Sequence, residues 1–172
     1  MTRQATQSEL LSEFGRVLDK DGRLLAMKHK WSFCKLRHNE YALVSSNCEM
    51  HFLLYFGHNT NIVVTLKPKG RILKTFGHPQ MGIYYTMTAD QVTECLCPLV
   101  TKQDVETSLR NHINAMNESC VRLMNGDLEE WCRYKPRIDR AVVDGMREYE
   151  RRLQKARQRA LRMCGNGSTH AI

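Results

Sequence analysis

The residues best suited to chemistry form a run of arginines and lysines near the end of the sequence. Residues 151–162 carry six positive charges and no negative charge. The arginine guanidinium group fits phosphate oxygens with paired hydrogen bonds, and binding to a nucleic-acid backbone releases condensed counterions. The pattern predicts contact with the phosphate backbone of RNA or DNA. The predicted contact residues are Arg151, Arg152, Lys155, Arg157, Arg159 and Arg162.

A second group of cations lies in the segment Lys67-Pro68-Lys69-Gly70-Arg71. Proline and glycine this close together indicate a turn. We interpret the segment as the tip of a β-hairpin, where three cations have no role in a core. Lys67, Lys69 and Arg71 are therefore predicted to contact the same phosphate backbone.

A metal site built from cysteine and histidine is the next chemistry to consider. Cys34 and His38, with Cys48 and His51, have spacings that suggest zinc ligands. Zinc needs four ligands that converge on one point. On a strand, Cys48 and His51 would point to opposite faces, so no metal site is predicted.

Catalytic motifs are missing from the sequence. It contains no glycine-rich phosphate loop, no Gly-x-Ser-x-Gly elbow and no His-Glu-x-x-His. The adjacent or near-adjacent glutamates at 129–130 and 148–150 do not converge on one substrate. We therefore expect no enzymatic activity, no catalytic residue and no cofactor.

The cysteines and the N-terminal residues bear on the cellular location of the protein. Seven cysteines at irregular spacing suggest reduced thiols rather than a disulfide framework. The first residues have no apolar segment of the kind that classical secretion signals carry. The longest uncharged run, 51–66, has polar residues at its centre, so no membrane span is expected. These features predict a cytoplasmic or other reducing intracellular location.

Net charge is the most informative bulk property. The 172 residues carry 26 positive and 18 negative charges, a net charge of +8, with a hydrophobic fraction of 42% that is typical of one soluble globular domain. The charge is uneven along the chain. Residues 20–86 carry +7 and residues 135–172 carry +6, whereas residues 1–19 carry −1 and residues 87–134 carry −4. This polarity favours a binding protein.

The first half of the chain predicts one helix and then a sheet. Thr6 and Glu9 form a capping-box pattern before an apolar stripe over residues 7–19. Short runs rich in β-branched and aromatic residues follow, separated by turn signals, and they predict an antiparallel meander of five or six strands. The candidate strands are 24–28, 32–37, 41–45, 51–56, 62–67, 71–76 and 83–87.

The second half of the chain returns to a helical period. Residues 102–124 predict a helix, while residues 90–97 fit either a short helix or, as we favour, a strand. Pro136 predicts the first turn of a helix that runs to about residue 163. Its narrow apolar stripe suggests a coiled-coil seam or a docked helix, and a homodimer is one arrangement that it would allow. The predicted seam is Ile138, Val142, Met146, Tyr149 and Leu153.

The order of elements is similar to that of small dimeric secretion chaperones. The segment Cys97-Pro98-Leu99-Val100, which leads into a helix at Lys102, resembles the last strand-to-helix step of that family. The resemblance implies a protein that binds a partner chain. This sequence departs from the family in being basic and in lacking a predicted middle helix within residues 57–81.

These observations predict an α+β fold, with an N-terminal helix, an antiparallel meander and C-terminal helices that include a long basic one. The expected divisions are a globular domain over 1–134, a basic amphipathic helix over 135–164 and a flexible tail over 165–172. The leading function is a non-enzymatic accessory protein that binds RNA or DNA. The alternative is a protein-binding adaptor, secretion-type chaperone or inhibitor that acts through its helical seam and sheet edge.

Overall fold

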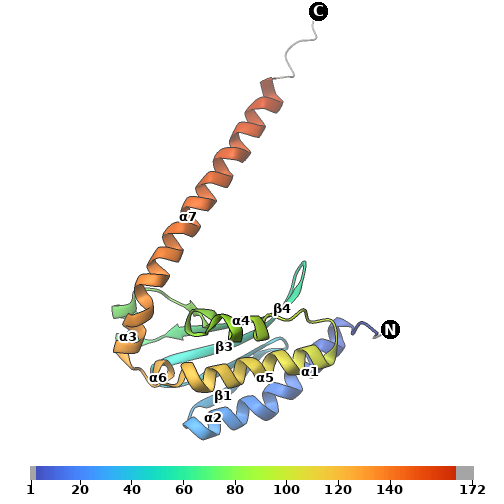
Figure 1. Cartoon of the computed structure of the whole chain (residues 1–172), viewed down its shortest axis with the longest axis vertical. Helices are drawn as coiled ribbons and strands as arrows, with labels where there is room; N and C mark the ends of the chain where they lie inside the picture. Colours follow the sequence, from blue (N-terminus) through green and yellow to red (C-terminus); the bar gives the residue numbers. More distant parts are fainter. Residues whose placement is uncertain (1–2, 166–172) are drawn as a thin grey trace, which may run out of the picture. The chain divides into compact units, whose positions relative to one another are not determined.

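The computed structural model describes the backbone of residues 3–165 and the side chains of residues 3–158. The chain divides into two compact units, Met1–Tyr134 and Lys135–Ile172. The architecture is α+β, as predicted: an N-terminal helix, a five-stranded antiparallel sheet and C-terminal helices that include a long one (Figure 1). A flexible tail is predicted over 165–172; Gly165 is instead the last residue of the long helix, and residues 166–172 lie outside the described residues.

The chain begins with a longer helical segment than the sequence predicts. Helix α1 (Gln7–Val17) starts at the Thr6 capping box, a π-helical turn η1 (Leu18–Gly22) follows, and α2 (Arg23–His29) continues from it. The predicted strand 24–28 is therefore wrong. Its sequence, Leu-Leu-Ala-Met-Lys, consists of strong helix formers, and Leu25 and Ala26 extend the buried face of the helix.

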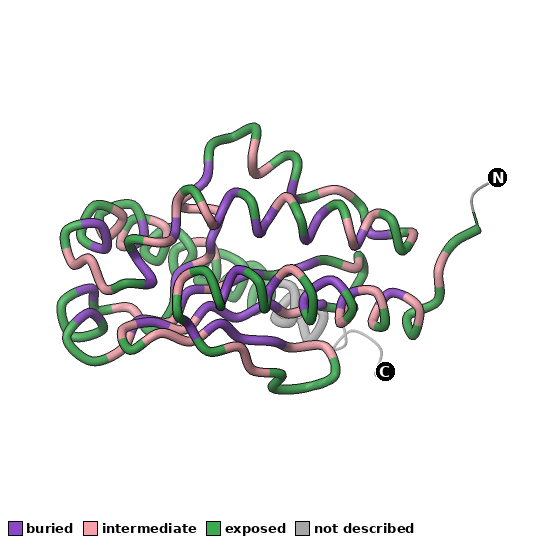
Figure 2. Tube along the Cα trace, turned by 90° about the horizontal axis from the view of Figure 1, so that it is seen from below, coloured by how far each residue is buried: buried purple, intermediate pink, exposed green. Residues whose placement is uncertain are grey.

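The sheet is a meander in which each strand pairs with its neighbour in sequence. Its strands are β1 (Ser32–Arg37), β2 (Glu40–Val44), β3 (Cys48–Phe56), β4 (Thr60–Pro68) and the short β5 (Met81–Gly82). Alternate residues from Cys48 to Leu54 in β3 and from Ile62 to Leu66 in β4 are buried on the face that they share. Figure 2 colours the trace by burial and shows buried residues in many of its segments. The buried face packs against the helices, where the rings of Phe14 and Tyr41 meet edge to face.

Three predicted strands or strand-like segments after β4 are helical. Residues 71–76 form α3 (Gly70–Phe76), residues 83–86 form the 3₁₀ turn η2 (Ile83–Thr86), and residues 89–95 form α4 (Ala89–Cys95). Ile72 and Phe76 are buried while Lys74 between them is exposed, which suits a helix, because on a strand all three side chains would share one face. The segment 57–81 therefore does contain a helix.

The C-terminal part of the chain is helical, as its apolar periodicity predicts, but some of the helices begin or end at other residues than predicted. Helix α5 (Lys102–Ser119) breaks at Cys120, and α6 (Val121–Met124) completes the predicted 102–124 segment. Helix α7 (Leu128–Gly165) begins after Asp127, whose side chain accepts a hydrogen bond from the Glu130 amide. The predicted helix start at Pro136 is wrong, because Pro136 lies inside α7.

Trp131 anchors the first turn of α7 in the core. Its side chain is fully buried, its indole N–H donates to the Leu123 carbonyl at 2.9 Å, and its ring meets that of Phe76 edge to face at 4.9 Å. The tryptophan thus joins the first turn of α7 to α3 and α6.

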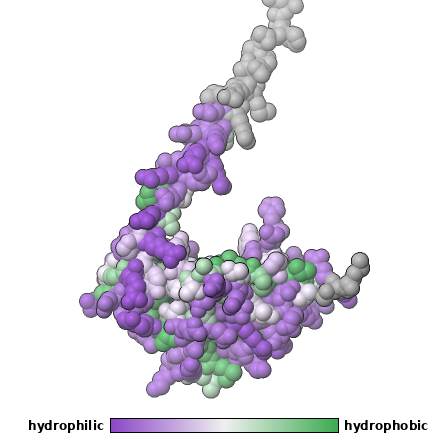
Figure 3. All heavy atoms as spheres, in the orientation of Figure 1, coloured by the Kyte–Doolittle hydropathy of each residue, from purple (hydrophilic) through white to green (hydrophobic). Residues whose placement is uncertain are grey.

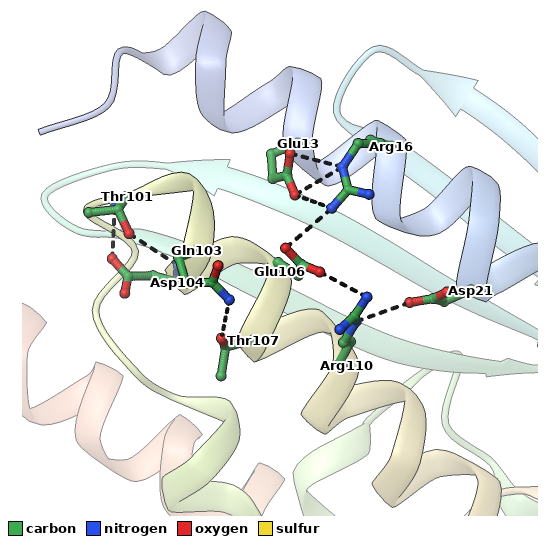
Figure 4. A network of polar contacts seen from close by, with 9 residues as sticks. All are labelled: Glu13, Arg16, Asp21, Thr101, Gln103, Asp104, Glu106, Thr107 and Arg110. Carbon is green, nitrogen blue, oxygen red and sulfur yellow. Dashed lines mark hydrogen bonds and ion pairs between the residues drawn. The ribbon is translucent and has the colours of Figure 1, made fainter.

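A chain of alternating charges joins α1, η1 and α5 on the surface (Figure 4). Arg16 bonds Glu13 and also contacts Glu106 at 3.3 Å. Glu106 contacts Arg110 at 2.8 Å, and Arg110 reaches Asp21 at 3.3 Å. Each exposed pair contributes little, but together they fix the register between the two helices.

We predict that Thr101→Ala destabilises the protein by about 1 kcal/mol, because it removes the N-cap of α5. The Thr101 hydroxyl accepts from the Asp104 amide at 3.2 Å, and the Asp104 carboxylate accepts from the Thr101 amide at 2.7 Å. Urea unfolding followed by circular dichroism measures the change.

Thr107→Ala is the matched control, since Thr107 is an exposed residue in the interior of the same helix. We expect its free energy of unfolding to stay within about 0.5 kcal/mol of the parent. Equal losses in the two variants would show that the cap has no special role.

Candidate nucleic-acid interface

Helical spacing on α7 gathers positive charges on one face. Five exposed cations follow one another at intervals of three, seven, four and four residues, with Asp144 in the longest gap, and form a line that we call the basic row. Its members are Arg137, Arg140, Arg147, Arg151 and Lys155. At 1.5 Å per residue, the row extends over about 27 Å. The view in Figure 3 shows that the described side chains of α7 on this side of the picture are mostly hydrophilic.

The opposite face of α7 carries an apolar stripe that is open to solvent. Val142 is 44% exposed, Met146 61%, Tyr149 64% and Leu153 39%. We call these four residues the apolar seam. Ile138, the first residue of the predicted seam, is buried and is therefore not part of this open surface.

The predicted arginine run separates into groups once it is placed on the helix. Arg151 and Lys155 belong to the basic row, whereas Arg152 and Arg157 lie beside the apolar seam. The side chains of Arg159 and Arg162 lie outside the described residues. Sequence reasoning missed Arg137, Arg140 and Arg147, because acidic residues interrupt the run before position 151. Extending the helical spacing backwards from Arg151 finds all three.

The acidic residues of α7 do not remove the arginines from solvent. Asp144 lies 3.7 Å from Arg147, and Glu148 lies 2.8 Å from Arg151 and 3.0 Å from Arg152. The hydrogen bond from Arg152, with the charge of Arg151, lowers the pKa of Glu148. Exposed pairs within one helix contribute little to stability, because solvent screens them. A phosphate can therefore replace these carboxylates at small cost.

Lys67 and Lys69 occupy a different setting from the predicted hairpin tip. Lys67 lies near the end of β4, and Lys69 precedes α3, so the hairpin prediction is wrong. The Lys69 Nζ atom lies 2.9 Å from a Glu49 carboxylate oxygen, and the Lys67 Nζ atom lies 3.4 Å from His51 Nδ1. Arg71, the third residue of this group, is exposed on α3.

A polar cluster that sequence reasoning missed surrounds His51. Its Nε2 atom lies 2.8 Å from Glu49 and its Nδ1 atom 3.0 Å from Glu40. Hydrogen bonds from His51 and Lys69 lower the pKa of Glu49. The pairing of Glu49 with Lys67 across β3 and β4 was the signal available in the strand pattern. Lys67 and Lys69 are thus held in a local network of opposite charges.

The acidic block at residues 87–134 finds many of its partners within Met1–Tyr134. Glu106 pairs with Arg16 and Arg110, as described above. Glu130 lies 2.9 Å from Arg122 and 3.3 Å from Arg133, and Arg122 also pairs with Asp127. These carboxylates balance arginines of the same unit.

Most of the described cysteines are shielded. Cys48, Cys95 and Cys120 are buried, and Cys132 is exposed. Burial raises the pKa of Cys48 to about 12 and that of Cys95 to about 11. These thiols are not nucleophiles at neutral pH. Among the described residues, no group of three or more histidine, cysteine or acidic side chains is placed to hold a metal ion.

His112 is a buried structural histidine on α5. Its Nδ1 atom lies 2.8 Å from the Ser108 carbonyl, and its Nε2 atom lies 3.1 Å from the Tyr84 hydroxyl. Burial lowers the pKa of His112 from 6.5 and raises that of Tyr84 to about 12. Both groups are therefore neutral at pH 7, and they tie η2 to α5.

We predict that the protein loses stability as the pH falls from about 7 to about 5. The unfolded chain protonates His112 near pH 6.5, whereas the folded protein resists protonation because the imidazole is buried. Stability from this residue is therefore complete above pH 6.5 and is lost below it. Urea unfolding at a series of pH values measures the slope.

His112→Gln should be less stable at pH 7 and should flatten that slope. His58→Gln, at an exposed turn position, is the control that should keep it. A slope that persists unchanged in His112→Gln would contradict the assignment, since carboxylates act only at lower pH.

Comparisons with known proteins leave the chain without an identified relative. No family model matches it, and neither does any curated protein or solved structure. In the part of the chain that the structure describes, no helix is long and apolar enough to cross a membrane. The candidate site therefore depends on the geometry of α7 itself.

Proposed function

We propose that this protein binds the phosphate backbone of RNA or DNA as a non-enzymatic accessory protein. The observation that carries the proposal is the basic row, five exposed cations on one face of α7. Arg71 on α3 is a further exposed cation of the predicted set.

The row matches the chemistry of a polyanion. Double-stranded DNA carries one negative charge per about 1.7 Å of its axis, so a row of about 27 Å faces many phosphates. Arginine and lysine contacts to phosphate position a protein on nucleic acid but do not read its sequence. The proposed binding is therefore independent of sequence and sensitive to salt.

The contribution expected from Lys67 and Lys69 is small. Both are engaged by Glu49 and His51, and freeing them would leave those groups without their partners. We therefore propose an interface on α7 rather than on the sheet.

We predict that affinity for generic RNA and DNA falls steeply as salt rises, and that Arg147→Gln/Arg151→Gln/Lys155→Gln weakens both affinity and salt dependence. Each lost phosphate contact lowers the slope of log K against log salt by about 0.7–0.9, so the triple variant should lose about 2 units of slope. Fluorescence anisotropy with labelled oligonucleotides over a salt series measures this.

The matched control is Lys20→Gln/Lys35→Gln/Lys74→Gln, which removes three exposed cations from the first unit and changes the net charge equally. It should keep the parent slope. Equal effects of the two triple variants would mean that binding follows net charge alone, and an absence of binding at low salt would refute the proposal.

A further inference from the structure

We infer that the apolar seam of α7 is the docking surface for an acidic amphipathic helix of a partner protein. The inference does not rest on the proposed function, because the seam and the basic row occupy opposite faces of the helix. The first observation is that the seam is exposed to solvent, since Met146 and Tyr149 are each more than 60% exposed. Helices of globular proteins normally bury their apolar stripe.

The spacing of the seam selects a helix as its occupant. Val142, Met146, Tyr149 and Leu153 follow one another at intervals of four, three and four residues. Alternating steps of four and three residues are those between positions d and a of a coiled coil, in which these side chains insert between those of a facing helix. A flat protein surface or a lipid layer would not require so narrow and regular a stripe.

Charge argues against a second copy of the chain as that occupant. Residues 135–165 carry a net charge of +6, so pairing two of these helices brings like charges together. With Met146 and Leu153 at position a, Arg152 lies at a flanking g position, and Glu150 and Arg157 lie at the flanking e positions that help to set partner choice. In a parallel pair Arg152 would face Arg157 of the second copy.

The same charges favour a partner of the opposite sign. Glutamates at the flanking positions of a facing helix could pair with Arg152 and Arg157, since both arginines are exposed. Arg152 would exchange its exposed contact with Glu148 for a contact at the edge of a closed seam. The structure thus assigns the seam to an acidic helix.

We predict that the full chain binds a designed heptad peptide with leucine at a and d and glutamate at e and g. Two control peptides separate helix docking from simple charge attraction. One has lysine at e and g, and the other keeps the acidic composition but has proline at its centre. Fluorescence anisotropy at physiological salt should show binding of the first peptide alone.

Met146→Gln/Leu153→Gln should weaken that binding by about tenfold or more, because each residue buries apolar surface only in the complex. Glutamine is a good helix former, and both positions are exposed, so circular dichroism should show an intact fold. Arg140→Gln/Arg147→Gln, on the opposite face, should stay within about threefold of the parent.

Three outcomes would overturn the inference. Equal binding of the proline peptide, or a larger loss in the arginine variant than in the seam variant, would mean that the basic row attracts any polyanion. Sedimentation of the parent as a dimer that the seam variant converts to a monomer would make a second copy the occupant. We expect the parent to sediment as a monomer.

Discussion

The burial of Trp131 is the constraint on which the start of α7 depends. A fully buried indole next to Phe76, bonded to the Leu123 carbonyl, ties the first turn of α7 to the core. Aromatic side chains of this size dominate the energetics of the core that they fill. With its first turn fixed, the remaining length of α7 needs little further support. The first turn is the costly step in forming a helix, and each residue added after it gains a backbone hydrogen bond.

The net charge of +8 divides into parts with different consequences. Within Met1–Tyr134, Glu106, Asp127 and Glu130 balance arginines of the same unit, and Glu49 balances Lys69. These cations contribute to the bulk charge but are partly occupied. Farther along α7, Asp144 and Glu148 pair with arginines of the same exposed helix, which leaves these arginines accessible to solvent. Bulk charge therefore overstates the binding capacity of the sheet, and it understates how strongly the C-terminal helix concentrates cations on one face.

Sequence patterns predicted the structure where local chemistry decides it and failed where tertiary packing does. The Thr6 capping box, and the strands 51–56 and 62–67 with the turn between them, follow directly from residue types and turn positions. The segment 71–76 misled because Ile72 and Phe76 are bulky and apolar, yet their spacing suits a helix that Gly77 ends in a left-handed conformation. Pro136 was assigned to a helix start because proline prefers that position. The burial of Trp131, which pattern alone does not reveal, starts the helix earlier. The arginine run of the candidate site could be read from the sequence. Its division into residues of the basic row and residues beside the apolar seam could be made only after the structure showed that α7 is one continuous helix.

Placing a basic row and an apolar seam on opposite faces of one helix has a physical consequence. A helix with its side chains is about 10–12 Å across, and charges in physiological salt are screened over about 8 Å. A nucleic acid on the row and an acidic helix in the seam would therefore not collide, but their charges would be separated by little more than one screening length. Each ligand would lower the positive potential that attracts the other, and linkage makes this coupling reciprocal. The two proposed ligands would thus avoid each other sterically but weaken each other electrostatically. Both effects would follow from the spacing of residues on α7, because the helical period that aligns the arginines also aligns the apolar residues on the opposite face.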